Sequence, residues 1–114
     1  MKKILITGGA GYIGSKLVNK LLDLNYKVTV IDILKFSGKS INHLFNNKNF
    51  KFIKGDVRNY KLISKLVKSN EFIIPLAALV GAPLCAKNKR EAISTNLESI
   101  KLMMKIISRK NKII

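Results

Sequence analysis

The sequence contains few acidic residues, few prolines and almost no cysteine. Its 114 residues include 6 Asp and Glu, 2 Pro, 7 Gly, 1 Cys and no Trp. The single cysteine, Cys85, has no partner for an internal disulfide and no companions at metal-ligand spacing. We therefore expect no metal site and a reducing compartment, the cytoplasm. The low content of glycine and proline argues against a disordered chain.

Long hydrophobic runs are also missing. The longest uncharged stretch, residues 72–86, is interrupted by Pro75, Gly81 and Pro83, and it is shorter than the roughly 20 residues of a bilayer-spanning helix. We predict no membrane span. With 47% apolar and 25% charged residues, the chain has the composition of a single globular domain with its own core.

The shortage of acidic residues leaves a strong excess of positive charge. Lys and Arg number 22, so the formal net charge is +16. Such a charge is compatible with nucleic-acid binding. However, the basic residues are spread from Lys2 to Lys112, and no segment resembles a recognition helix, a zinc finger or an aromatic RNA-binding motif. We favour solvated lysines over a nucleic-acid surface, and the charge in either case favours an anionic ligand.

Strand and helix patterns alternate along the chain. Runs of apolar and β-branched residues predict strands at 3–7, 26–32, 50–56 and 71–79, with a fifth strand beginning in the last four residues, "NKII". Helical spacing predicts helices at 12–24, 60–69 and 91–108, and the polar connection 33–49 has at most one helical turn, near 41–45. This order predicts an α/β protein with a doubly wound parallel sheet of the Rossmann type, covered by helices on both faces and ending as its fifth strand begins.

Each predicted helix has an apolar face. In the first helix the recurring apolar positions are Ile13, Leu17, Leu21 and Leu24; in the second, Leu62, Ile63, Leu66 and Val67; in the third, Ile93, Leu97, Ile100, Met104 and Ile107. We expect these faces to pack against the sheet, and for the third helix a contact with a second subunit is the alternative. Met103 and Met104 are likewise assigned to a core or to a subunit contact, and His43, alone in a polar connection, to solvent.

The first strand leads directly into a glycine-rich turn, "TGGAGYIGS". Gly8 allows the chain to leave the strand sharply, Gly11 lets a pyrophosphate approach the backbone, and Gly14 lets the following helix pack closely. Asp32 ends the second strand, close to the roughly 20 residues expected for the carboxylate that binds the ribose hydroxyls. A carboxylate there repels a 2′-phosphate, so the pattern predicts NAD over NADP. A P-loop is excluded because Ser15 precedes Lys16 instead of following it.

Five segments resemble the extended short-chain dehydrogenase/reductases, and among them the NAD-dependent epimerase/dehydratases of nucleotide sugars. They are "TGGAGYIGS", "VID", "KGDVRN", "IIPLAAL" and "TNLESIKLMM". The resemblance implies that the amides of Tyr12 and Ile13 bind the pyrophosphate and that Asp56 and Val57 flank the adenine. It also implies that Leu76, Ala77 and Ala78 line the nicotinamide half and that Asn96 lies near the cofactor.

Structural alternatives remain open for several of these residues. For Asp56 the alternative to contact with a cofactor is capping of a turn. For Ala77 and Ala78 the alternative is close packing of small residues, and Asn96 is about equally well explained as a hydrogen-bonding residue of its helix. Cys85 has no recognisable base near it and is assigned to packing.

The chain also departs from the family pattern. Pro75 stands where many members have His, which predicts an irregular end of the fourth strand. The family's Ser or Thr after the fifth strand and its Tyr-x-x-x-Lys are missing; only Tyr12 has a lysine four residues on, Lys16, and we interpret that match as accidental. The sequence thus predicts the NAD-binding part of a nucleotide-sugar epimerase/dehydratase that is inactive alone, with the sugar nucleotide bound only when the catalytic part is present. The alternative is a non-catalytic dinucleotide-binding or regulatory module, and in either case the 91–108 helix could form a homodimer.

Overall fold

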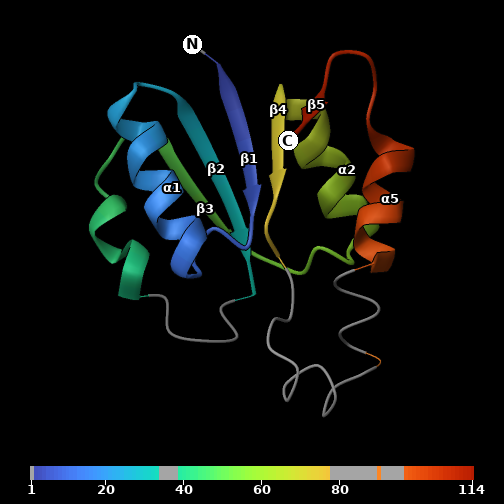
Figure 1. Ribbon diagram of the computed structural model, residues 1–114, viewed down its shortest axis with the longest axis horizontal. Helices are drawn as coiled ribbons and strands as arrows, with labels where there is room; N and C mark the ends of the chain where they lie inside the picture. Colours follow the sequence, from blue (N-terminus) through green and yellow to red (C-terminus); the bar gives the residue numbers. More distant parts are fainter. Residues whose placement is uncertain (1, 34–38, 78–89, 91–96) are drawn as a thin grey trace.

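The computed structural model describes residues 2–33, 39–77, 90 and 97–114 (Figure 1). In this part of the chain the elements are β1 (Lys3–Thr7), α1 (Tyr12–Asp23), β2 (Lys27–Asp32), the 3₁₀ helix η1 (Lys39–Leu44), β3 (Phe50–Lys54), α2 (Tyr60–Ser69), β4 (Phe72–Pro75), α5 (Ser99–Ile106) and β5 (Lys112–Ile113). Ala78, Cys85, Ile93 and Asn96 lie outside the described residues. Of the helices in the described part, none has the length and apolar character needed to cross a membrane.

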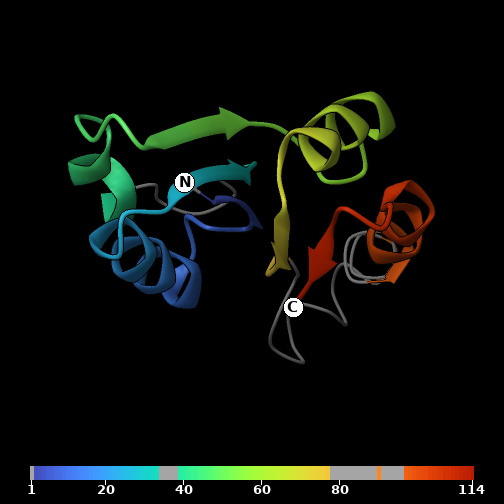
Figure 2. The same cartoon turned by 90° about the horizontal axis from the view of Figure 1, so that it is seen from above.

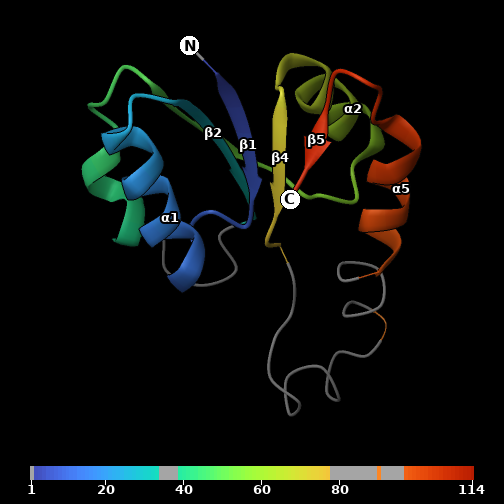
Figure 3. The ribbon, with the colours of Figure 1, turned by 45° about the horizontal axis from the view of Figure 1, so that its top comes forward.

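The described strands form one five-stranded parallel sheet in the order β3-β2-β1-β4-β5. β1 is central, and the direction in which strands are added reverses between β1 and β4. Figure 3 shows β1, β4 and β5 side by side with their arrowheads toward the same edge. The predicted doubly wound α/β class is confirmed, and a ligand in such a sheet binds beyond the carboxyl ends of the strands at this reversal.

Helices cover both faces of the sheet, so the strands are apolar on both sides. On one face, Ile4 and Ile6 of β1 pack with Val18 of α1 and with Ile41 and Leu44 around η1. On the other face, Leu5 and Ile73 pack with α2 and α5. Figure 2, seen from above, shows α1 and η1 on one side of the sheet and α2 and α5 on the other. The helical turn expected near 41–45 is η1, shifted by two residues at its start.

The apolar face predicted for α1 is partly wrong. Ile13 and Leu24 are 68% and 55% exposed, whereas the buried residues are Gly14, Ser15, Val18 and Leu22, and Leu17 and Leu21 are partly buried. The buried face of α1 is rotated relative to the predicted face, and Gly14 explains this rotation. Having no side chain, it lets its own face of the helix approach the preceding loop most closely, and this turns Ile13 outward.

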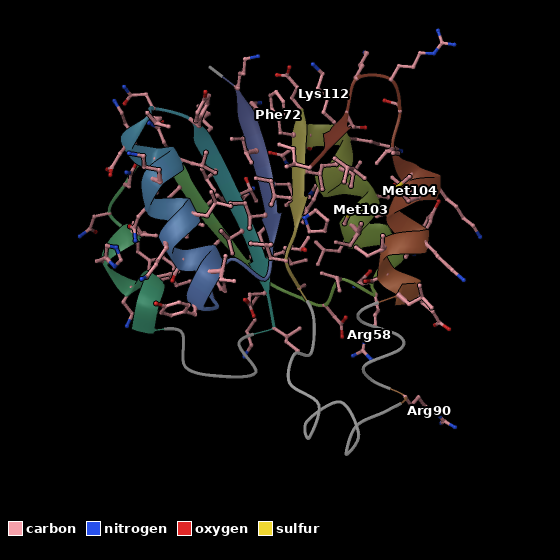
Figure 4. The ribbon with its side chains drawn as sticks, viewed as in Figure 1. Arg58, Phe72, Arg90, Met103, Met104 and Lys112 are labelled. Atoms are coloured by element: carbon pink, nitrogen blue, oxygen red, sulfur yellow. The ribbon has the colours of Figure 1, made fainter. Side chains whose placement is uncertain are left out.

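For α2 the prediction is confirmed, and for α5 it is partly wrong. Ile63, Leu66 and Val67 of α2 are buried with Met103 of α5, and Figure 4 shows Met103 and Met104 on α5, which lies beside α2. Leu97 and Met104, by contrast, are 50% and 55% exposed. Because α5 packs on α2 through the side that carries Met103, Met104 remains at the surface. Leu97 lies before the first residue of α5.

Several strands are shorter than predicted. β4 ends at Pro75, four residues before the predicted end at 79, because β1 ends at Thr7 and offers β4 no partner beyond the Thr7–Pro75 pair. β2 begins at Lys27 and β3 ends at Lys54, one and two residues inside the predicted limits. β5 is the predicted fifth strand and pairs with β4.

A pair of isoleucine substitutions tests this packing. Ile6 is fully buried on the central strand and Ile13 is mostly exposed. We expect Ile6→Ala to lower the free energy of unfolding by about 2–5 kcal/mol and Ile13→Ala to change it by no more than about 0.5 kcal/mol. Urea denaturation followed by circular dichroism measures both. Equal losses for the two variants would contradict the observed orientation of α1.

Candidate cofactor-binding site

Gly8 makes the sharp exit from β1. It has φ +75°, a left-handed conformation that favours glycine. Its amide donates to the Ile31 carbonyl at 2.8 Å, and its carbonyl accepts from the Gly11 amide at 3.2 Å. A Cβ on Gly8 would lie 2.7 Å from the Ala77 Cα and amide nitrogen. The turn therefore lies directly against the backbone that follows β4, and no other residue fits at this position without displacement of the backbone.

Gly14 holds the start of α1 against the same turn. A Cβ on Gly14 would lie 2.6 Å from the Gly8 carbonyl oxygen and 2.7 Å from the Gly9 Cα. Both atoms belong to the backbone, so a side chain cannot be accommodated by rotating a neighbour. This is the close helix packing predicted for the third glycine.

Gly11 differs from the other two glycines. A Cβ placed on it would meet only the Gly8 carbonyl oxygen, at an ordinary 3.5 Å, and its φ of −76° suits any residue. Nothing in the described fold therefore requires glycine at this exposed position. A glycine here leaves the backbone open to close approach from outside, which is the role predicted for it with a pyrophosphate.

The first turn of α1 offers free donors at the same place. The amides of Tyr12, Ile13 and Gly14 have no acceptor among the described residues, as expected at a helix N-terminus. The first turn carries no acidic residue, so the positive end of the helix dipole is not neutralised there. The side chains of Tyr12 and Ile13 are exposed to solvent. Their backbone amides are the groups that this end of the helix presents to a ligand.

Tyr12 and Lys16 contact each other on the surface of α1. The Lys16 Nζ donates to the Tyr12 hydroxyl at 2.9 Å and lies 4.5 Å from the centre of the ring. The Tyr-x-x-x-Lys spacing thus brings the two groups together at the start of α1, because residues four apart share one face of a helix.

Asp32 ends β2 with its carboxylate toward the glycine-rich turn. Its Oδ2 accepts from the Ala10 amide at 3.1 Å, and its backbone carbonyl accepts from the Gly55 amide at 3.1 Å. The hydrogen bond from Ala10 orients the Asp32 side chain toward the glycine-rich turn. The hydrogen bond from Gly55 connects the end of β2 to the residue that follows β3. The half-buried carboxylate is therefore held beside the open backbone of Gly11.

Asp56 follows β3 and forms a tight pair with Arg58. Its Oδ1 accepts from the Arg58 amide at 2.8 Å and from the Arg58 Nε at 2.9 Å, and its Oδ2 accepts from the Arg58 guanidinium. Asp56 therefore caps a turn, as its structural alternative predicted. The Val57 side chain is buried with α2 and α5, which leaves only its backbone available to a ligand.

The hydrogen bonds from Arg58 lower the pKa of the Asp56 carboxyl. The hydrogen bonds from the Arg58 side chain hold the pKa of the Asp56 carboxyl below its ordinary value of 3.8. A carboxyl whose pKa is depressed in the folded state stabilises that state above its ordinary pKa and loses this contribution as the pH falls. Asp56 is therefore an ionised acceptor at neutral pH.

Leu76 and Ala77 follow β4 and are held by the end of β1. The Leu76 amide donates to the Thr7 carbonyl at 2.8 Å, and the Ala77 amide donates to the Thr7 Oγ1 at 3.2 Å. Leu76 also packs on the α1 side of the core and Ala77 on the α2 side. A packing role is thus present for both residues, and the small Ala77 lies where Gly8 approaches.

The carboxyl ends of the four longest strands carry the candidate residues in a fixed spatial order. Across the sheet these are Ala77 after β4, the glycine-rich turn after β1, Asp32 at the end of β2 and Asp56 after β3. Two residues that hold candidate site residues in place, Thr7 and Arg58, were not predicted from the sequence. Thr7 was assigned only to the first strand. Arg58 could have been found from its position two residues after an aspartate.

The family model of the NAD dependent epimerase/dehydratase family matches residues 4–112. The UDP-glucose 4-epimerase of Rickettsia bellii is 34% identical over 84% of the chain. Among solved structures, the UDP-glucose 4-epimerase of Thermotoga maritima is 30% identical with a TM-score of 0.78 over 90% of the chain. The dTDP-glucose 4,6-dehydratase of Streptomyces venezuelae, solved with NAD and TYD bound, is 25% identical with a TM-score of 0.83 over 91% of the chain.

The chain spans about a third of the length of these relatives. It covers 30% of the Rickettsia enzyme, 33% of the Thermotoga structure and 35% of the Streptomyces structure. The similarity therefore concerns the part of each relative that corresponds to the glycine-rich turn and the sheet described above.

Gly14 and Gly11 form a matched pair for testing the turn. We expect Gly14→Ala to lower the free energy of unfolding by more than about 2 kcal/mol, because a methyl group would overlap backbone atoms. Gly11→Ala should cost no more than about 1 kcal/mol, the effect of alanine at an N-cap. Urea denaturation compares them. A Gly11→Ala loss as large as that of Gly14→Ala would show that Gly11 is required by the fold itself.

Proposed function

The chain belongs to the NAD dependent epimerase/dehydratase family, and we propose that its described residues bind NAD across the carboxyl ends of the strands. The observation that carries this proposal is the spatial order of the candidate groups. From β4 through β1 and β2 to β3, the candidate groups are the small apolar Ala77, the glycine-rich turn with its free amides, and then two carboxylates, those of Asp32 and Asp56. NAD presents a nicotinamide, a diphosphate, a ribose and an adenine in the same order.

The adenosine half of NAD is the better supported half. We infer that the amides at Gly11, Tyr12 and Ile13 bind the diphosphate, because donors without acceptors and an uncompensated helix dipole favour an anion. Asp32 then accepts from the ribose hydroxyls. Asp56 and the Val57 amide lie one strand further on, where the adenine would lie.

The residues proposed for the nicotinamide half are taken more from the family resemblance than from contacts in the structure. Leu76 and Ala77 follow β4 beside Gly8 and can line one side of a flat ring. Ala78 and Asn96, which lie outside the described residues, are proposed as further cofactor neighbours. Bound NAD would supply a hydride acceptor at its nicotinamide, and these residues would bind and orient it.

Asp32 also determines which dinucleotide is bound. NADP carries a phosphate on the ribose hydroxyl that a carboxylate at this position would contact, and two negative groups at that distance repel. We therefore propose NAD as the cofactor.

At the level of the whole reaction, we propose a nucleotide-sugar epimerase or dehydratase, an isomerase or oxidoreductase in class, working in the cytoplasm. Residues 1–114 contain no Tyr-x-x-x-Lys other than Tyr12 and Lys16. That pair lies at the start of α1, beside the diphosphate position. We thus expect this domain to bind NAD, and turnover of a nucleotide sugar to require catalytic residues beyond the 114. The alternative, a non-catalytic dinucleotide-binding module, predicts the same binding without a catalytic partner.

Replacement of Asp32 tests the cofactor assignment. We expect Asp32→Ala to raise the Kd for NAD by about 10- to 100-fold, the loss of one or two hydrogen bonds to a charged acceptor, and to narrow the preference for NAD over NADP. Isothermal titration calorimetry measures both dinucleotides. Asp23→Asn, which removes a charge from the exposed far end of α1, is the control and should bind NAD normally.

Two results would contradict the assignment. An unchanged NAD affinity in Asp32→Ala would remove Asp32 from the ribose site. Absence of NAD binding by the unmodified chain, at a concentration where circular dichroism shows it folded, would overturn the proposed function as a whole.

We further propose that α5 contributes to a homodimer. Leu97 and Met104 expose apolar side chains that the described core does not use, and burial of such groups in a subunit contact is favourable. Met104→Lys should shift the protein toward monomer in sedimentation velocity, whereas Leu24→Lys, at an equally exposed position after α1, should not. A monomeric unmodified chain would contradict the dimer without affecting the cofactor assignment.

A further inference from the structure

An open hollow with a volume of about 820 Å³ lies at the edge of the sheet opposite the proposed cofactor site. It is bounded by the starts of β1 and β4, the end of α2 and the turn between α5 and β5. Figure 4 shows this end of the molecule by Phe72 and Lys112, which begin β4 and β5, and the cofactor edge by Arg58. The five residues of β1 separate the hollow from the glycine-rich turn by about 13 Å. Its volume is within the range of small-molecule sites.

Three lysines from different elements line the hollow. Side chains alternate along a strand, so Lys3 lies on the same face of the sheet as Leu5, which is the face covered by α2 and α5. Lys68 belongs to the last turn of α2, and Lys110 lies in the turn before β5. The three ammonium groups have no acceptor and no aromatic partner among the described residues. Each can therefore donate up to three hydrogen bonds to a ligand.

The other lysines at this end of the sheet have partners. Lys2 Nζ and Lys112 Nζ lie 5.2 Å and 5.9 Å from the centre of the Phe72 ring, which packs on the α1 side of the sheet. Glu71 is the acidic residue of the lining, and its Oε1 lies 4.0 Å from Lys2 Nζ. Its charge is thus partly compensated by a lysine that does not line the hollow. The lining itself has three ammonium groups and one carboxylate, an excess of positive charge.

The end of α2 would oppose an anion if its carbonyl oxygens were free, because they carry the negative end of the helix dipole. Asparagine side chains bind these oxygens instead. The Asn111 Nδ2 donates to the Val67 carbonyl at 2.9 Å and to the Asn70 carbonyl at 2.7 Å. The Asn70 Nδ2 donates to the Leu66 carbonyl at 2.8 Å. The lysine ammonium groups are therefore the charged groups of the hollow that remain available to a ligand.

The arrangement of these charges favours a compact anion over a long one. A phosphate chain presents several charged oxygens within a few ångströms, so it can contact ammonium groups that approach from three elements. A single-stranded nucleic acid needs a track of cations and exposed aromatic rings on which its bases stack. The aromatic ring at this edge, that of Phe72, is already contacted by Lys2 and Lys112.

We propose that the hollow formed by Lys3, Lys68 and Lys110 is a second ligand site, which binds a small molecule through a chain of linked phosphate groups. The site lies at the opposite edge of the sheet from the cofactor, so both can be occupied at once. The inference does not depend on the proposed function, because none of the three lysines belongs to the cofactor site. The phosphate chain could come from inorganic polyphosphate or from a nucleotide, and the experiment distinguishes these two sources.

The experiment uses tripolyphosphate and cytidine triphosphate, which carry the same number of linked phosphate groups. Isothermal titration calorimetry at physiological ionic strength gives the Kd of each for the unmodified protein, Lys68→Gln, Lys110→Gln and Lys112→Gln. Lys112→Gln is the matched control, because it removes the same charge from the same end of the sheet but from a lysine outside the lining. Each titration is repeated with saturating NAD, and circular dichroism confirms that every variant is folded.

We expect the unmodified protein to bind tripolyphosphate with an affinity that NAD does not change. Lys68→Gln and Lys110→Gln should each raise the Kd by about tenfold, the loss of one charge-assisted hydrogen bond. Lys112→Gln should change it by less than about twofold, since salt screens a charge that does not contact the ligand. Tighter binding of cytidine triphosphate than of tripolyphosphate would identify a nucleotide as the ligand. An equal or weaker affinity would identify the phosphate chain alone.

Three results would overturn the inference. The first is the absence of tripolyphosphate binding by the folded, unmodified chain. The second is an equal loss of affinity in Lys112→Gln and Lys68→Gln, which would show a general effect of the net charge. The third is displacement of tripolyphosphate by NAD, which would place the anion at the glycine-rich turn. A chain that binds tripolyphosphate but no NAD would contradict the proposed function and leave this second site standing.

Discussion

The structure depends on direct backbone contact at the end of β1. Gly8 leaves the strand with φ +75° and lies against the backbone of Ala77, while Gly14 brings α1 onto Gly8 itself. A side chain at either glycine would overlap backbone atoms that cannot move independently. This contact makes β1, the first turn of α1 and the end of β4 one rigid unit. The free amides of α1 consequently point to a defined place above the reversal of strand order.

Two of the six acidic residues of this basic chain are held by specific hydrogen bonds at this edge. Asp32 is bound to the Ala10 amide, and Asp56 is bound to the amide and guanidinium of Arg58. Each carboxylate therefore keeps a fixed orientation. With a net charge of +16 over the chain, the long-range field favours an anionic ligand. The two carboxylates act at shorter range, and the role proposed for Asp32 is to distinguish a ribose from its phosphorylated form.

Sequence reasoning succeeded where one local cause dominates. The strand, glycine and helix pattern at residues 3–23 located β1 and α1 within one residue, because the turn residues and the apolar periodicity agree. It failed where contact with another element determines which side chains of a helix are buried. On α1, the contact at Gly14 rotated the helix and exposed Ile13. On α5, packing against α2 buried Met103 and left Met104 at the surface. Periodicity identifies an amphipathic helix but not the neighbour that it meets.

The sequence by itself determined the alternation of strands and helices, the three glycines of the turn and the acidic residue that ends β2, because each depends on residues close together in the chain. Only the tertiary structure decided that Asp32 faces the turn, that Gly11 is open while Gly8 and Gly14 are packed, and that Arg58 binds Asp56. These features depend on the register between strands and on atoms that meet in space. Gly8 and Ala77, for example, lie far apart in the sequence and are brought together only when the parallel strands pair.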